Sequence, residues 1–299
     1  MSAPAIAARG LSKDYGCGRG LFELDLEVER GEVFGFLGPN GAGKSTTMRL
    51  LLDLIRPTSG SAQMLGLDTV EDSLAIRRRV GFLPGDLEMY ARLTGRVMLD
   101  YLAQLRGGVD KGVRDSLAER FDADLNRPIR ELSTGNRQKL GLIQAFMHEP
   151  ELLILDEPIA GLDPLVQQSF HALLGEASAG GRTVFLSSHT LSEVERVTDR
   201  LAILRAGRLV VVDSLQNLRK VAVQRLEIEF AAPVDAREFR SLPGVTEAHA
   251  DGSTVVVGFE GSADAVVKTA ARYEVRAIRP REDDLEDIFL RYYRASGPG

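Results

Sequence analysis

Short apolar runs alternate with helical patterns along the first two thirds of the chain. Residues 33–37, 80–83, 152–155, 184–186 and 201–204 are almost continuously aliphatic or aromatic. Such runs are typical of strands buried on both faces. Segments with helical spacing lie between them. Strands that alternate with helices predict an α/β fold with a mostly parallel sheet covered on both sides.

Other segments refine this picture without changing it. Residues 22–28 alternate between apolar and polar side chains, which predicts a half-buried strand. A helix is predicted over residues 46–55, closed by a turn at Pro57 and Gly60. A mostly helical stretch is predicted from about Thr94 to Met147.

The pattern changes near Lys220, and we therefore expect two domains, 1–219 and 220–299. The second domain reads strand-helix-strand-strand-helix-strand, which predicts a small α+β domain of the ferredoxin-like kind. The predicted elements are residues 226–230, 234–240, 245–250, 254–259, 263–273 and 275–278, followed by an amphipathic helix over 285–293.

Composition narrows the class of protein. The formal net charge is -6 and basic residues form no long run, so nucleic acid is not an expected ligand. Cys17 is the single cysteine, which excludes an internal disulfide and a cysteine-rich zinc site. No apolar stretch approaches the length of a membrane span, and residues 1–9 do not resemble a signal peptide. If the protein serves a membrane, we expect it to do so through a partner.

A glycine-rich turn joins the first buried run to the following helical pattern. Its residues are Gly38, Pro39, Asn40, Gly41, Ala42, Gly43, Lys44, Ser45 and Thr46. Glycines allow backbone N–H groups to surround phosphate oxygens, and the helix presents its positive end to them. Lys44 would reach the β- and γ-phosphates, and Ser45 would hold Mg²⁺. Because this turn lies between a buried strand and a helix, we interpret it as a nucleotide-phosphate loop.

Two adjacent carboxylates follow the buried run 152–155. Neighbouring side chains on a strand point in opposite directions, so Asp156 and Glu157 cannot share one role. Asp156 suits Mg²⁺, and Glu157 suits polarising an attacking water. An acidic pair can also simply end a strand in solvent. The phosphate loop in the same chain favours the chemical interpretation.

Between these two motifs lies the segment Leu132-Ser133-Thr134-Gly135-Asn136-Arg137-Gln138, directly before a helical pattern. Ser133 is placed as an N-cap, and a helix start is a second site for an anion. The segment alone would be read only as a helix cap. Its position ahead of Asp156 gives it a second interpretation.

Together these motifs resemble ABC transporter ATPases. The resemblance rests on the phosphate loop, the segment at Ser133, the strand end at Asp156-Glu157, the turn Gly161-Leu162-Asp163 and the triplet Ser187-Ser188-His189, in that order. It implies a P-loop NTPase core with an antiparallel β subdomain and a helical subdomain over about 86–147. The C-terminal part is similar to the appended domain of multidrug and antibiotic exporters.

The resemblance also implies a mechanism. Two subunits would form a head-to-tail dimer, as a homodimer or with a related ATPase, with ATP between the phosphate loop of one and the signature residues Ser133, Thr134, Gly135 and Asn136 of the other. Catalysis would involve Lys44, Glu157 as the general base and His189 at the γ-phosphate. Asp163 would link the two sites, and Tyr15 would stack on adenine.

Two departures from the family pattern stand out. Thr134 and Asn136 replace the usual glycine and glutamine of the signature. Gly85 occupies the position of a glutamine that senses Mg²⁺ and couples the core to the helical region. We expect a looser hinge at Gly85 rather than replacement by Asp86 or Glu88, because a further carboxylate beside the triphosphate would add repulsion.

The expected function is therefore ATP hydrolysis that drives transport, and export in particular, through a separate multi-span permease. The protein would lie peripherally at the cytoplasmic face of the cell membrane. Two other classes are weighed against this one: a non-transport ABC ATPase acting on nucleic acid or ribosomes, and a module that binds ATP without turnover. The first usually carries two such domains or a basic arm, and Glu157 together with His189 argues against the second.

Overall fold

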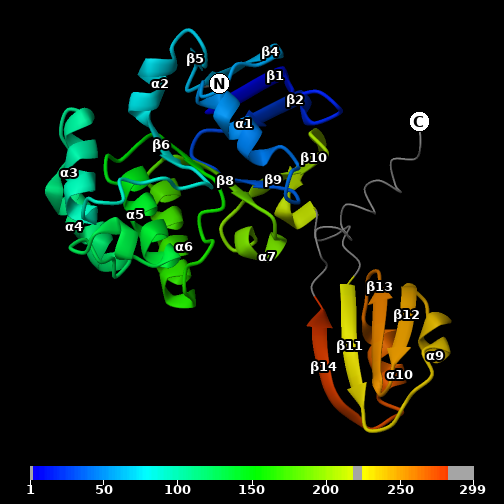
Figure 1. The fold of residues 1–299 in the computed structure, drawn as a ribbon. Coiled ribbons are helices and arrows are strands. Elements are labelled where there is room, and N and C mark those ends of the chain that lie inside the picture. Colours follow the sequence, from blue (N-terminus) through cyan, green and yellow to red (C-terminus); the bar gives the residue numbers. More distant parts are fainter. Residues whose placement is uncertain (1–2, 218–223, 282–299) are drawn as a thin grey trace. The chain divides into compact units, whose positions relative to one another are not determined.

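The computed structural model describes residues 3–217 and 224–281, and these form two compact units (Figure 1). One unit spans Met1–Leu215 and the other Gln216–Gly299. The sequence places the division after residue 219, four residues beyond the end of the first unit. Within the described ranges, no helix has both the length and the apolar character needed to cross a membrane.

The first unit is built on a six-stranded sheet in the order β10-β9-β3-β8-β7-β6. All neighbours pair in parallel except β10, which is antiparallel to β9. Every residue of β3, β7 and β8 is buried, which explains why these runs lack polar alternation. The predicted parallel α/β core is confirmed. The strands are β3 (Val33–Leu37), β6 (Val80–Leu83), β7 (Leu152–Leu155), β8 (Thr183–Ser188), β9 (Arg200–Arg205) and β10 (Arg208–Ser214).

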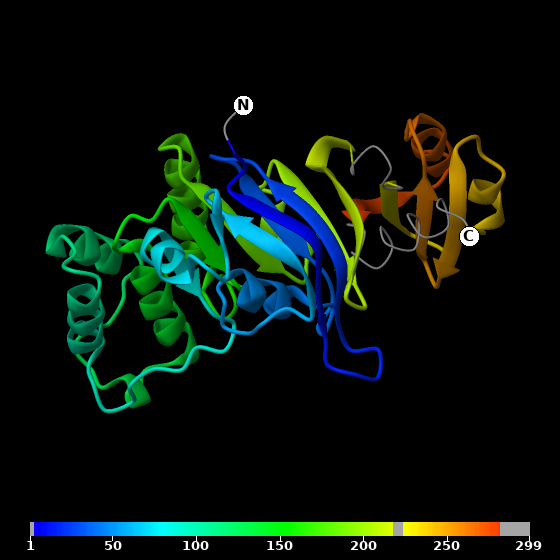
Figure 2. The same cartoon turned by 90° about the horizontal axis from the view of Figure 1, so that it is seen from above.

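A second, antiparallel sheet has the order β2-β1-β4-β5. Figure 2 shows it, blue to cyan, lying over the core sheet. One apolar cluster that includes Leu24, Phe36 and Met48 joins this sheet, the core sheet and helix α1. The strands are β1 (Ile6–Asp14), β2 (Gly20–Val28), β4 (Ser59–Met64) and β5 (Leu67–Asp68).

Helices complete the first unit, and three of them gather in a separate helical region (Figure 1). This region holds α3, α4 and α5 within the predicted range 86–147. Helix α1 differs from its prediction: it begins at Lys44, and it ends at Leu51 because Asp53 takes a left-handed φ of 53°. The helices are α1 (Lys44–Leu51), α2 (Ser73–Arg79), α3 (Gly95–Leu105), α4 (Lys111–Arg120), the 3-10 turn η1 (Ile129–Glu131), α5 (Thr134–Phe146), α6 (Pro164–Ala179) and α7 (Leu191–Val194).

The second unit has the strand-helix-strand-strand-helix-strand order that the sequence predicts. Its sheet order is β12-β13-β11-β14, and every pair is antiparallel. Phe230, Phe239 and Phe259 are fully buried in its own core. Both helices are shorter than predicted, and the helix predicted over 285–293 lies outside the described residues. The elements are β11 (Gln224–Phe230), α9 (Arg237–Arg240), β12 (Val245–Asp251), β13 (Thr254–Phe259), α10 (Asp264–Ala270) and β14 (Val275–Arg281).

A polar junction ties the helical region to the start of β6. The Val80 carbonyl lies 3.2 Å from His148 Nε2 and accepts a hydrogen bond from Arg106 Nη2 at 3.4 Å. Arg106 Nη1 also donates to the Arg77 carbonyl. Burial, with the nearby Arg106 charge, lowers the pKa of His148 to about 4. The imidazole is therefore neutral near pH 7 and donates to Val80.

The depressed pKa of His148 makes part of the stability depend on pH. An unfolded histidine binds a proton below about pH 6.5, whereas folded His148 resists protonation until about pH 4. Its contribution is complete above pH 6.5 and is lost as pH falls toward 4. We predict that His148→Gln, which keeps a donor for Val80, loses less thermal stability than wild type between about pH 7 and about pH 5. Equal losses in the two proteins would contradict this assignment.

The division into two units makes a second prediction. A chain of residues 1–219 should fold and bind ATP with wild-type affinity, because the core clusters of the two units share no residue. Fluorescent-nucleotide titration and circular dichroism measure binding and folding. A soluble fragment that does not bind ATP would show that the first unit is not independent.

Candidate nucleotide site

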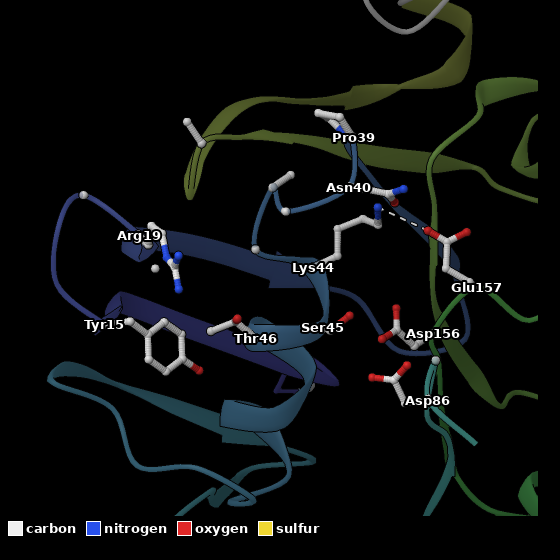
Figure 3. A pocket seen from close by; sticks show the side chains of 17 residues that line it. Tyr15, Arg19, Pro39, Asn40, Lys44, Ser45, Thr46, Asp86, Asp156 and Glu157 are labelled. Atoms are coloured by element: carbon white, nitrogen blue, oxygen red, sulfur yellow. Dashed lines mark ion pairs between the residues drawn. The ribbon is translucent and has the colours of Figure 1, made fainter. Parts of the chain in front are cut away.

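The phosphate loop lies where the sequence predicts it, between the end of β3 and the start of α1 (Figure 3). A Cβ at Gly38 would lie 2.4 Å from the Leu204 carbonyl oxygen, so only glycine fits there. Gly43 has a φ of 111°, a conformation that favours glycine. The backbone of the turn therefore requires glycine at these two positions, whatever ligand the loop binds.

The loop borders a cavity of about 650 Å³, a size common for small-molecule sites. Tyr15, Asp156 and Glu157 line it together with the predicted loop residues 39–46. Tyr15 is 52% exposed at one side of the cavity (Figure 3), and Lys13 Nζ lies 5.7 Å from the centroid of its ring. Gly85 and Asp86 also line the cavity, together with four residues that the sequence did not single out: Gly18, Arg19, Gly20 and Ala206.

Lys44 carries a buried charge in this cavity. Its side chain is only 6% exposed, and its Nζ donates to the Gly38 carbonyl at 2.5 Å. The same Nζ lies 3.2 Å from Glu157 Oε1. A buried ammonium needs such partners, because an uncompensated charge away from water is strongly unfavourable. The loop lysine and the acidic strand end are therefore in direct contact.

The two carboxylates after β7 have different partners, although both lie beyond the end of the strand and strand alternation is not the reason. Asp156 is 4% exposed, and its Oδ1 accepts a hydrogen bond from Ser187 Oγ at 2.5 Å. Ser187 Oγ in turn accepts from the Glu157 N–H at 3.0 Å. Glu157 has a left-handed φ of 50°, which costs a non-glycine residue about 1–2 kcal/mol. Such strain persists where neighbouring contacts determine the backbone.

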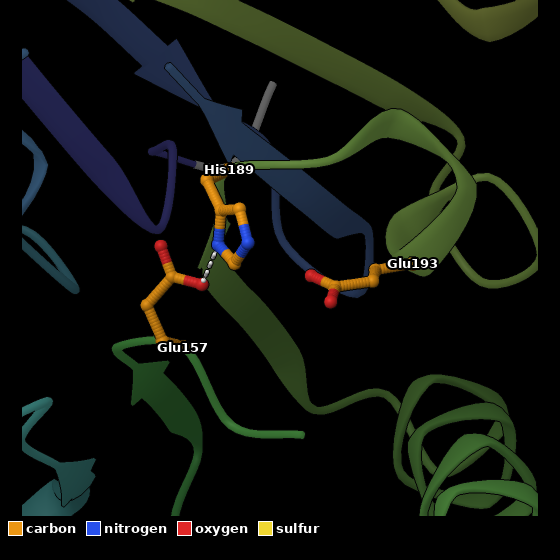
Figure 4. Close-up of side chains that lie close together, drawn as sticks. All are labelled: Glu157, His189 and Glu193. Atoms are coloured by element: carbon orange, nitrogen blue, oxygen red, sulfur yellow. Dashed lines mark hydrogen bonds and ion pairs between the residues drawn. The ribbon is translucent and has the colours of Figure 1, made fainter. Parts of the chain in front are cut away.

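His189 follows β8 and contacts Glu157 (Figure 4), at the carboxylate oxygen that Lys44 does not contact. Its Nδ1 lies 2.9 Å from Glu157 Oε2, and the ring is 49% exposed. No sequence motif pointed to Glu193, whose carboxylate accepts a hydrogen bond from Ser188 Oγ. One ligand atom each of Glu157, His189 and Glu193 lie within 4.8 Å of one another. The predicted base and histidine are thus a contacting pair.

The donor set fits a hard divalent cation at the strand end. Ser45 and Asp156 line the same cavity and offer hydroxyl and carboxylate oxygens, the ligands that Mg²⁺ prefers. Asp156 keeps Oδ1 on Ser187, so its other oxygen remains for a cation or its water. These two residues would hold Mg²⁺, as the sequence predicts.

The signature residues lie in a different depression of the same chain. Ser133 caps α5, and its side chain accepts from the Asn136 N–H at 3.2 Å, so the predicted N-cap is confirmed. Asn136 Oδ1 accepts from the Asp124 N–H at 3.3 Å, a local contact for this departure from the family pattern. The depression measures about 650 Å³ and shares no lining residue with the nucleotide cavity. Ser133, Thr134, Gly135 and Asn136 therefore do not meet Lys44 within one subunit.

Asp163 also lines the signature depression, where it caps α6. Its Oδ1 accepts from the N–H groups of Leu165 and Val166 at 3.1 and 3.0 Å. Gln167 donates to the Leu162 carbonyl from the same helix. These contacts give the turn at Asp163 a fixed shape within its own subunit.

Comparisons with known proteins agree with this geometry. A family model described as ABC transporter matches residues 21–160. A bacitracin transport ATP-binding protein from Enterococcus faecalis is 34% identical over 98% of this chain and 97% of its own length. The chain belongs to the ABC transporter family.

Two further relatives place it among the ATP-binding subunits of that family. A daunorubicin resistance ATP-binding protein from Streptomyces coeruleorubidus is 39% identical over 73% of this chain and 71% of its own length. A solved structure described as an ATP-binding subunit of an ABC transporter superposes with a TM-score of 0.66 at 30% identity, covering 72% of this chain and 92% of the other.

Gly85, where this ABC subunit lacks the family's glutamine, lies against Asp156. A Cβ at Gly85 would be 3.1 Å from Asp156 Oδ2, closer than most side chains pack. Asp86 lines the cavity, and its Oδ2 lies 3.6 Å from Nη2 of Arg49 on α1. The Asp86 side chain is nevertheless 93% exposed. An ion pair between exposed groups contributes little. Asp86 therefore lies beside the cavity, but its one ion pair holds the side chain only weakly.

We predict that Asp86→Ala keeps ATP turnover within about threefold of wild type, a change of less than about 1 kcal/mol in barrier. Glu88→Ala is the matched control, because exposed Glu88 is not among the residues that line the cavity. Steady-state turnover at saturating Mg-ATP measures both. A tenfold loss for Asp86→Ala alone, with ATP affinity intact, would instead make Asp86 the replacement for the missing glutamine.

Proposed function

We propose that this ABC subunit hydrolyses ATP in a Mg²⁺-dependent reaction and thereby powers export through a separate multi-span permease. The observation that carries the proposal is the convergence of Lys44, Glu157 and His189, with Glu157 between the other two. A module that only binds ATP would need Lys44 but not a carboxylate and an imidazole aligned beside it.

The proposed reaction is attack of water on the γ-phosphorus, with cleavage of the bond to the β-γ bridging oxygen. Backbone N–H groups of the phosphate loop and Lys44 would balance the phosphate charge. Glu157 would accept the proton of the attacking water, and His189 would orient the γ-phosphate and that water. Mg²⁺, held by Ser45 and Asp156, would supply charge neutralisation at the phosphates.

Lys44 and Glu157 form an ion pair in the structure. For ATP to bind, Nζ must turn from Glu157 Oε1 toward the phosphates, which offer a stronger charge partner. The exchange would leave Glu157 with His189 as its neighbour and free one carboxylate oxygen for water. In this proposal, the phosphates of ATP would take the place of the Glu157 carboxylate as the charge partner of Lys44.

The proposed working form is a dimer. Within one subunit the signature depression and the nucleotide cavity have separate linings, so a complete site requires a second copy or a related ATPase. In a head-to-tail arrangement, Ser133 and Gly135 of one subunit would close the cavity of the other. Asp163, in the same depression, would face that shared boundary. The C-terminal unit, which carries none of these groups, would support assembly.

The proposed cargo and location rest on the relatives. Their names associate them with bacitracin transport and daunorubicin resistance, so we propose a drug-like or antibiotic compound as cargo. The subunit would act at the cytoplasmic face of the cell membrane, held there by its permease. Neither the composition nor the site suggests nucleic acid as a partner.

We predict that Glu157→Gln lowers turnover by about a hundredfold, the low end for a general base. ATP should still bind, because the amide removes a negative charge beside the triphosphate. The proposed ATP-bound dimer should persist because ATP is not hydrolysed. Gel filtration with Mg-ATP should therefore show a larger species than for wild type. Phosphate release measures the turnover.

Glu149→Gln is the control for this substitution. It makes the same chemical change at a surface residue that pairs with Arg182, and it should leave turnover unchanged. Near-normal turnover of Glu157→Gln would remove Glu157 from its assigned role. Wild-type protein that binds ATP but releases no phosphate would refute the proposed function itself.

A further inference from the structure

A buried glutamine on the signature helix contacts the backbone of the proposed general base. Gln138 belongs to α5 and is 9% exposed. Its Nε2 lies 3.2 Å from the carbonyl oxygen of Glu157 and 3.0 Å from that of Pro158. Both neighbours are acceptors only, so the amide NH₂ must face them and donate to each.

Together with a second side chain, Gln138 holds the backbone of Glu157 on both sides. Glu157 has a left-handed φ, and its N–H is held by Ser187 Oγ from β8. Its carbonyl is held by Gln138 from α5. The peptide groups on both sides of the Glu157 Cα are therefore fixed by side chains from two other elements. Their contacts direct the carboxylate toward Lys44 and His189.

We propose that Gln138 is a positioning residue for Glu157: it touches no reacting atom but fixes the backbone from which the base extends. The inference rests on the proposed ATPase function. Because Gln138 lies on the helix that begins at the signature residues, the geometry of one subunit's base depends on where its own signature helix lies. Removing the two donors should misplace the carboxylate without changing the phosphate loop.

The primary variant is Gln138→Met, which keeps the length of the side chain and removes both donors. We expect turnover to fall by about tenfold or more, since small misplacements of catalytic groups cost on the order of a hundredfold. Affinity for a fluorescent ATP analogue should stay within about twofold, because Lys44 and the loop are untouched. Gln144→Met makes the same change further along α5, and we expect turnover within about twofold of wild type.

A double variant separates positioning from a merely structural role. If Gln138 acts through Glu157, adding Gln138→Met to Glu157→Gln should lower the residual single-turnover rate by no more than about twofold. If Gln138 only stabilises the fold, the fold-reductions in rate caused by Gln138→Met and by Glu157→Gln should multiply in the double variant. Gln138→Asn, whose amide is too short to reach both carbonyls, should reproduce the effect if the methionine variant is unstable.

Three results would overturn the proposal: wild-type turnover of a folded Gln138→Met or Gln138→Asn, multiplicative losses in the double variant, or a loss in Gln144→Met equal to that in Gln138→Met. These outcomes are distinct from failure of the proposed function. If wild type hydrolyses ATP and Glu157→Gln does not, the ATPase assignment stands even when Gln138 proves dispensable.

Discussion

The parallel register of β3, β8 and β7 is the constraint on which the site depends. Leu37 pairs with Ser188, and Leu155 pairs with Leu186, so the three strands end at the same edge of the sheet. Each strand then contributes one chemical group: Lys44 after β3, His189 after β8 and Glu157 after β7. A ligand site at the carboxyl edge is the general consequence of such a sheet. Here it brings Lys44 together with two residues more than a hundred positions further along the chain.

Charge balance explains why these residues contact each other. A lysine that is 6% exposed requires a nearby acceptor, and the Gly38 carbonyl and Glu157 provide it. In the proposed function, the phosphates of ATP would replace this carboxylate as the partner of Lys44. The helix N-terminus at the phosphate loop adds a further preference for negative charge.

The local motifs could be predicted from the sequence, whereas the contacts that hold them in place could not. Phosphate loops, strand-end carboxylates and N-caps such as Ser133 have short sequence signatures with a physical reason. Gln138 and Ser187 lie within predicted motifs, but their hydrogen bonds to the backbone of Glu157 could not be predicted, because these bonds join segments that meet only in the fold. The order of strands and helices along the C-terminal unit could be predicted from its hydrophobic pattern. The end of α1 did not, because the left-handed turn at Asp53 is not marked by a glycine.

The central claim is that ATP is held between the phosphate loop of one subunit and the signature of another. Cross-linking measures this directly. In a Cys17→Ser background, Asn40→Cys on one tagged chain and Thr134→Cys on another would be mixed and treated with a short bis-maleimide. The account predicts a cross-linked pair that contains both tags, forms with Mg-ATP and is absent without nucleotide. A cross-link within single chains, or one that is independent of ATP, would contradict it.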